Sequence, residues 1–73
     1  MTLKSLLKLI KGDEELNIYD VINNTYLHED IFREQCDSIY DYYKVIKIMT
    51  SRTGMGTPII EIEVANNKEL SIG

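Results

Sequence analysis

The chain has 73 residues, 44% of them hydrophobic and 27% charged, and its net charge at pH 7 is -4. This length predicts a single small domain over residues 1–73, and the hydrophobic share excludes a disordered chain. No apolar run approaches the roughly 18 residues of a membrane helix, the N-terminus lacks the apolar centre of a signal peptide, and the single cysteine excludes an internal disulfide. We therefore expect a cytoplasmic protein with no membrane partner.

The acidic charge is concentrated in one segment. Residues 13–43 carry nine acids against a single arginine, a balance of -8. Residues 1–12 and 44–60 each carry three basic residues and no acid. Because a segment this negative repels phosphate backbones, we expect no direct binding of nucleic acid and a partner that is basic.

The N-terminal segment predicts a helix. Leucine and isoleucine recur there with the spacing of one helical face, at positions 3, 6, 7 and 10. Thr2 is suited to cap the first turn, and Gly12 is suited to close the last. These signals place a helix between the two residues.

A β-hairpin is predicted next. Residues 15–22, with the sequence ELNIYDVI, alternate between apolar and polar side chains in the manner of a strand. Asn23 and Asn24 tolerate positive φ, which favours a tight turn into a second strand at residues 25–28.

From Asp30 to Tyr43 the apolar period changes from two to nearly four, which predicts a second helix. One face of this helix is apolar and carries Phe32, Cys36, Ile39 and Tyr43. The opposite face is acidic and carries Asp30, Glu34, Asp37 and Asp41.

Two further strands are predicted at residues 43–50 and 58–65, with lysines of the first facing glutamates of the second. Leu70 and Ile72 alternate near the C-terminus, where a short fifth strand is an option. The predicted fold class is α+β: two helices packed on one face of a small, mainly antiparallel sheet, in the order α-β-β-α-β-β.

The glycine-containing loop between these strands has two interpretations. A strand follows it instead of a helix, and it lacks the G-K-[ST] signature, so a hairpin tip is the simpler interpretation. Its polar side chains and glycines would also suit an anion-binding nest. The residues of that nest would be Arg52, Thr53, Gly54, Gly56 and Thr57.

The sequence contains no catalytic signature. His28 is the only histidine and has no partner at metal-ligand spacing. Cys36 lies on the predicted apolar face, where a thiol behaves as a small hydrophobe. We therefore expect no enzymatic activity, no metal ion and no cofactor.

All five tyrosines fall inside the acidic segment. The run YDYY at residues 40–43 spans more of a helix than one buried face covers, so Tyr40 or Tyr42 is expected to be exposed. Tyrosine beside carboxylates is a combination that suits protein binding, although an acidic helix face is often simply solvated. The predicted partner-binding residues are Asp30, Glu34, Asp37, Asp41, Tyr40 and Tyr42.

The opening TLKSLLKLIKGDEELNIYD, a short leucine helix followed by acids and a strand ending in Asp20, resembles small acidic proteins of phages and mobile elements in Gram-positive bacteria. The predicted layout of residues 2–65, helix, hairpin, helix and hairpin, is similar to theirs. This broad class includes anti-CRISPR and other anti-defence proteins, several of which occupy the nucleic-acid sites of their targets. The resemblance implies an inhibitor whose partner is a nucleic-acid-binding defence effector, and it assigns no individual residue. The lysine-bearing segments depart from a uniformly acidic mimic of nucleic acid.

Together these observations predict a non-enzymatic protein that binds a larger basic protein. Carboxylates spaced along the second helix would replace phosphates in a basic groove and compete with nucleic acid. Two alternatives remain open: a module that binds a nucleotide or other anion through the loop at residues 52–57, and an accessory subunit that forms a homodimer.

Overall fold

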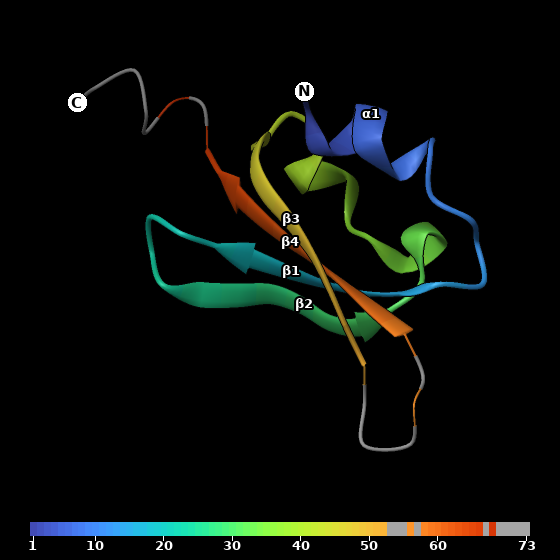
Figure 1. The fold of residues 1–73 in the computed structure, drawn as a ribbon. Helices are drawn as coiled ribbons and strands as arrows, with labels where there is room; N and C mark the ends of the chain where they lie inside the picture. Colours follow the sequence, from blue (N-terminus) through green and yellow to red (C-terminus); the bar gives the residue numbers. More distant parts are fainter. Residues whose placement is uncertain (53–55, 57, 67, 69–73) are drawn as a thin grey trace.

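The structure is a computed structural model that describes residues 1–52, 56, 58–66 and 68. Within these residues one short α-helix, four strands and two 3-10 turns, η1 and η2, follow one another along the chain (Figure 1). The elements are α1 (Leu3–Leu7), β1 (Glu15–Asp20), β2 (Thr25–Ile31), η1 (Arg33–Gln35), η2 (Ser38–Tyr40), β3 (Lys44–Arg52) and β4 (Pro58–Ala65).

The four strands form one mixed sheet in the order β2-β1-β4-β3. β1 pairs antiparallel with β2 and parallel with β4, while β3 and β4 form an antiparallel hairpin. Figure 1 shows α1 and the two turns over one side of this sheet, and no described segment covers the other side. The chain is therefore α+β-like, with a covered and an open sheet face.

The core lies between the covered face of the sheet and the layer formed by α1 and the turns. Alternate residues of the two central strands, β1 and β4, point into it, as their alternating burial shows. Burying one such aliphatic side chain contributes about 1.5–3 kcal/mol, so this small set supplies much of the driving force for folding. The buried apolar side chains of this cluster are Leu3, Leu6, Ile10, Leu16, Ile18, Ile62 and Val64.

The predicted N-terminal helix is present but shorter than the apolar spacing suggests. It covers Leu3–Leu7, and the side chain of Thr2 caps it by accepting a hydrogen bond at 3.2 Å from the backbone amide three residues later. Beyond the cap at Lys8, the backbone amides of Leu9 and Ile10 donate to carbonyl oxygens three residues earlier, which is the tighter 3-10 pattern. The helix therefore ends before Gly12, while Ile10 still reaches the core.

The predicted hairpin is confirmed, but its turn spans residues 21–24, because β1 ends at Asp20 and not at residue 22. Asn24 adopts a φ of 52°, a left-handed conformation in which asparagine is enriched. The carboxylate of Asp20, only 2% exposed at the end of β1, accepts hydrogen bonds from the amides of Ile22 and Asn23 and from the Asn23 side chain. A buried acid therefore holds this turn.

The predicted second helix is wrong. β2 extends through Ile31, with Asp30 at a φ of 52° where the pairing with β1 is irregular. The two short turns η1 and η2 follow, separated by Cys36 and Asp37 in extended conformations. The fold is thus a mixed four-stranded sheet with one helix and two 3-10 turns, not two helices packed on a sheet.

Two physical features oppose a helix in this segment. Acids recurring every three or four residues would place like charges side by side on a helix. The Asp37 side chain accepts a hydrogen bond at 3.1 Å from the amide of Ile39, and such a local bond competes with helical hydrogen bonding.

The segment covers the sheet without being helical. Cys36, Tyr40 and Tyr43 pack against the core. Phe32 and Ile39, both assigned to the buried face of the predicted helix, are instead 40% and 68% exposed. Because the segment forms turns, the residues that contact the core differ from those that a 3.6-residue helical period predicts.

The two strands predicted at residues 43–50 and 58–65 are confirmed as β3 and β4. Their register places Lys47 opposite Glu63, as the predicted facing charges require, but Met49 opposite Glu61. The short fifth strand predicted around Leu70 and Ile72 lies outside the described residues.

Candidate protein-binding face

The four acids of the predicted stripe lie on different local structures. Asp30 belongs to β2, Glu34 to η1, and Asp37 and Asp41 flank η2. The Asp37 carboxylate caps η2. The regular one-turn spacing of a helix, which was the basis for imitating a phosphate backbone, does not apply to these residues. Whether they contact a partner stays a prediction.

Basic residues lie close to two of these acids. Because cationic and anionic groups surround the same hollow of about 410 Å³, it favours neither an anion nor a cation. The Arg33 guanidinium is already used there, since its Nη1 donates to the carbonyl oxygen of Ile10 at 2.6 Å. The hollow is lined by Lys4, Leu7, Lys8, Arg33, Glu34 and Asp41.

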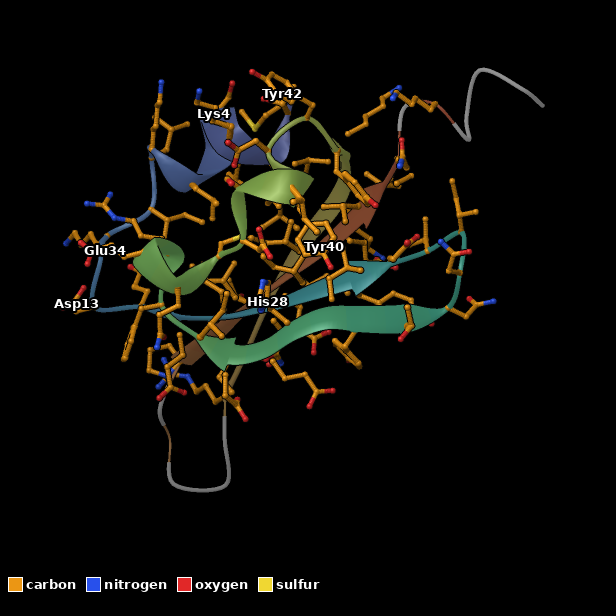
Figure 2. All side chains as sticks on the ribbon, turned by 180° about the vertical axis from the view of Figure 1, so that it is seen from behind. Lys4, Asp13, His28, Glu34, Tyr40 and Tyr42 are labelled. Carbon is orange, nitrogen blue, oxygen red and sulfur yellow. The ribbon has the colours of Figure 1, made fainter. Side chains whose placement is uncertain are left out.

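The structure does not bring the two predicted partner-binding tyrosines together with Glu34. Tyr40 packs inward, with ring centroids 5.7 Å from His28 and 5.2 Å from Tyr43. Tyr42 is 71% exposed, so the prediction that one tyrosine of the pair is exposed is confirmed. Figure 2 shows Tyr40 near His28 over the sheet, and Tyr42 well separated from Glu34.

The histidine and the cysteine both serve the layer that covers the sheet. His28 Nε2 accepts a hydrogen bond from the amide of Asp37 at 3.1 Å. Burial, followed by the charges of Asp41 and Asp37, raises the pKa of the Cys36 thiol from 9.0 to about 11. Such a thiol is a poor nucleophile at neutral pH. Among the described residues no group of three or more potential metal ligands is gathered.

Of the predicted anion-binding loop, the structure describes Arg52 and Gly56. Arg52 Nη1 donates to the carbonyl oxygen of Gly56 at 3.5 Å, and Gly56 has a φ of 83°, which glycine adopts readily. The pairing of Arg52 with Pro58 confirms that the loop closes a hairpin. Because Thr53, Gly54 and Thr57 lie outside the described residues, anion binding by this loop stays a prediction.

The open face of the sheet gathers another set of acids and tyrosines. Tyr19 of β1 lies beside Glu63 in the parallel pairing with β4, and opposite Tyr26 in the antiparallel pairing with β2. Met49 of β3 lies opposite Glu61. These residues line an open hollow of about 200 Å³. We call the set of Tyr19, Tyr26, Met49, Glu61 and Glu63 the tyrosine-glutamate face.

Two donors hold the carboxylate of Glu61 in place. The side-chain amide of Asn17 donates to Glu61 Oε1 at 3.2 Å, and the hydroxyl of Tyr26 donates to the same oxygen at 3.3 Å. Asn17 lies on β1, which pairs with β4, and Tyr26 lies on β2, the strand beyond β1. The sheet itself therefore fixes the orientation of this acid. A carboxylate that is already oriented loses less entropy when it binds a ligand.

The acids of this face keep unused acceptor capacity. No other described residue donates to Glu61, and none donates to the carboxylate of Glu63. Lys47 lies opposite Glu63 in the ladder, yet no ion pair joins the two side chains in the described part of the chain. Both glutamates therefore remain able to accept hydrogen bonds from a positively charged group.

The carboxylates of this face affect the titration of the neighbouring Tyr26 hydroxyl. The charge of Glu61 is the main cause that raises the pKa of the Tyr26 hydroxyl above 10.0, and the charge of Glu29 adds to it. A negative potential disfavours a phenolate for the same reason that it favours a cation. The face is thus suited to positively charged ligands.

Comparisons of the chain with protein-family models, with curated proteins and with solved structures found no match. Across the described residues, no helix combines the length and the apolar character needed to cross a bilayer.

The sequence-based prediction did not include the tyrosine-glutamate face. One signal for it exists, because the glutamates in IIEIEV alternate with isoleucines and must share the strand face opposite the core. From the sequence, Glu61 and Glu63 are predicted only as partners for lysines of the facing strand. The parallel pairing that brings Tyr19 to Glu63 has no local signal, since it joins residues far apart in the chain.

Proposed function

We propose that this protein is a non-enzymatic binding module that recognises a basic surface of a larger protein through the tyrosine-glutamate face. One observation carries the proposal: two glutamates with unused acceptor capacity lie beside two tyrosines on a sheet face that no described segment covers. Tyrosines supply rigid contact area at low entropic cost, and carboxylates steer the approach of basic partners. The net charge of -4 acts in the same direction.

The partner that we propose is a nucleic-acid-binding protein, such as a defence effector. Surfaces that bind nucleic acid are basic, so an acidic protein that occupies one of them competes with the nucleic acid. The resemblance of the N-terminal sequence to small proteins of phages and mobile elements favours an inhibitor of the anti-CRISPR or wider anti-defence class. Competition of this kind requires acids on a stable surface and does not require them on a helix.

The test is a charge reversal on the open face with a matched reversal on the covering layer. The first variant is Glu61→Lys combined with Glu63→Lys, and the control is Glu34→Lys combined with Asp37→Lys. Each tagged chain is incubated with nuclease-treated bacterial lysate, and retained proteins are identified by mass spectrometry. Each retained protein is then purified, and its nucleic-acid binding is measured by fluorescence anisotropy with each variant added.

We expect the wild-type chain and the control variant to retain the same basic protein and to displace its nucleic acid. The Glu61/Glu63 variant should do neither, while its circular dichroism spectrum stays unchanged. Equal retention by all three chains would exclude the tyrosine-glutamate face. Loss only in the Glu34/Asp37 variant would transfer the role to the residues first predicted from the sequence.

A further inference from the structure

The hollow of the tyrosine-glutamate face has the dimensions of a site for one side chain. Its volume of about 200 Å³ is the space of roughly seven water molecules, too small for an element of secondary structure. Met49 contributes an apolar thioether side chain, and the two tyrosines and two glutamates supply the rest of the lining. A ligand in this space therefore meets aromatic, apolar and anionic groups together.

The tyrosine rings are arranged so that a planar cation can stack on them. Tyr19 and Tyr26 meet edge to face, with centroids 4.9 Å apart and an interplanar angle of 76°. In such a pair the two rings cover neither face of the ring that presents its edge and only one face of the other ring. Cations bind to the faces of aromatic rings because the ring quadrupole is negative there.

The carboxylates lie within the same lining. Glu61 is oriented by Asn17 and by the Tyr26 hydroxyl, which both donate to its Oε1 atom. Its other oxygen and the Glu63 carboxylate accept no hydrogen bond from the described residues. Because Glu61 and Glu63 are two residues apart on one strand, they point to the same face about 6.6 Å apart along β4.

We infer that this hollow is a recognition site for an arginine side chain of the partner. This inference rests on the proposed function and names the residue type through which the partner is recognised. A guanidinium group is planar, stacks on aromatic rings and donates a fork of hydrogen bonds that matches a carboxylate. A lysine ammonium is a compact, strongly hydrated point charge and offers neither the plane nor the fork. The combination of two rings with two acids therefore selects arginine over lysine.

The experiment uses three glycine-serine peptides with blocked termini that differ only at one central residue, which is arginine, lysine or citrulline, so that this residue supplies any charge. Citrulline keeps the planar shape of arginine but carries no charge. Each peptide is titrated at constant ionic strength into the 15N-labelled 73-residue chain, and amide chemical shifts are followed by NMR. The arginine peptide should give saturable shifts centred on the tyrosine-glutamate face and bind at least about fivefold more tightly than the lysine peptide. The citrulline peptide should give no saturable shift.

Single substitutions separate the contributions of charge and ring. Glu61→Gln keeps an acceptor for Asn17 and should weaken arginine binding about tenfold. Tyr26→Leu should weaken it about threefold, whereas Tyr26→Phe, which keeps the ring, should retain most of the affinity. Glu34→Gln removes one acid from the covering layer and is the matched control, which should leave affinity unchanged.

The outcomes distinguish this inference from the proposed function. Equal binding of the arginine and lysine peptides at this face would overturn selection for arginine and leave the proposed basic partner supported. Equal binding of the citrulline peptide would overturn recognition of a cation. Shifts centred on Glu34, Asp37 and Asp41, or no response to either charged peptide, would overturn both proposals.

Discussion

The two faces of the central strands have different side chains and different roles. On β1 and β4, the covered face carries Ile18 and Ile62, which are completely buried, while the open face carries Tyr19 and Glu63, which are partly exposed. The same four-stranded backbone therefore presents an apolar surface on one side and an aromatic, acidic surface on the other. Burial of the first surface drives folding, whereas the second surface stays partly accessible to solvent.

The largest effect should come from the covered face. Ile62→Ala removes a completely buried side chain from a central strand and should lower the free energy of unfolding by about 2–5 kcal/mol. Met49→Ala, on the open face, should lower it by about 1 kcal/mol or less. Urea denaturation followed by circular dichroism measures both. A comparable loss in the two variants would show that the open face also contributes to packing.

A smaller loss of stability is expected for Asp20, the buried acid that accepts hydrogen bonds from the turn of the first hairpin. Asp20→Ala would leave the amides of Ile22 and Asn23 without their acceptor and should cost about 2 kcal/mol. Asp37→Ala, which removes the exposed cap of η2, should cost about 0.5–1 kcal/mol. The same denaturation experiment compares the two carboxylates. Equal losses would contradict the structural role assigned to Asp20.

The thiol of the covering layer should react slowly. A pKa raised from 9.0 to about 11 leaves roughly 100-fold less thiolate at pH 8, so Cys36 should react with iodoacetamide about 100-fold more slowly in the native chain than in urea. The native rate should rise about tenfold per pH unit and level off near pH 11. Mass spectrometry of timed samples gives both rates. Similar rates in native and denatured chains would show that the covering layer does not protect the thiol.

The smallest effect concerns the pKa of the Tyr26 hydroxyl on the open face. A neighbouring charge, and not deep burial, is the main cause of its shift. The pKa of its hydroxyl is raised above 10.0 chiefly by the charge of Glu61, so Glu61→Gln should lower it toward that value. Because the folded-state pKa exceeds the unfolded value, the stability linked to this group is present below pH 10 and is lost as the pH rises through the folded-state pKa. NMR titration of the tyrosine ring signals measures the pKa. An unchanged value in Glu61→Gln would contradict the negative potential at this face.

Five of the six predicted principal elements were accessible from local patterns. The apolar spacing at residues 3–10 and the cap at Thr2 located α1, although its last turn tightened. Period-two alternation located the strands, and Asn24 located the first hairpin turn. The helix at residues 30–43 failed because a period near four does not by itself overcome like charges and the capping bond of Asp37.

The candidate site could not be predicted in the same way. The tyrosine-glutamate face contains none of the partner-binding residues that the sequence predicts. The acids predicted to form one helical stripe lie instead on β2 and around the two turns. A wrong period therefore changes which side chains become neighbours.

The sequence by itself determined where the chain alternates, where it turns and which strand positions are apolar, because these depend on side-chain size and on backbone preferences within a few residues. Only the tertiary structure decided that β4 lies parallel to β1, between β1 and β3. That pairing brings Tyr19 beside Glu63, although the two residues are distant in the chain. Its physical basis is the joint burial of the apolar faces of β1 and β4 under one covering layer, a gain that depends on the whole chain and on no single segment.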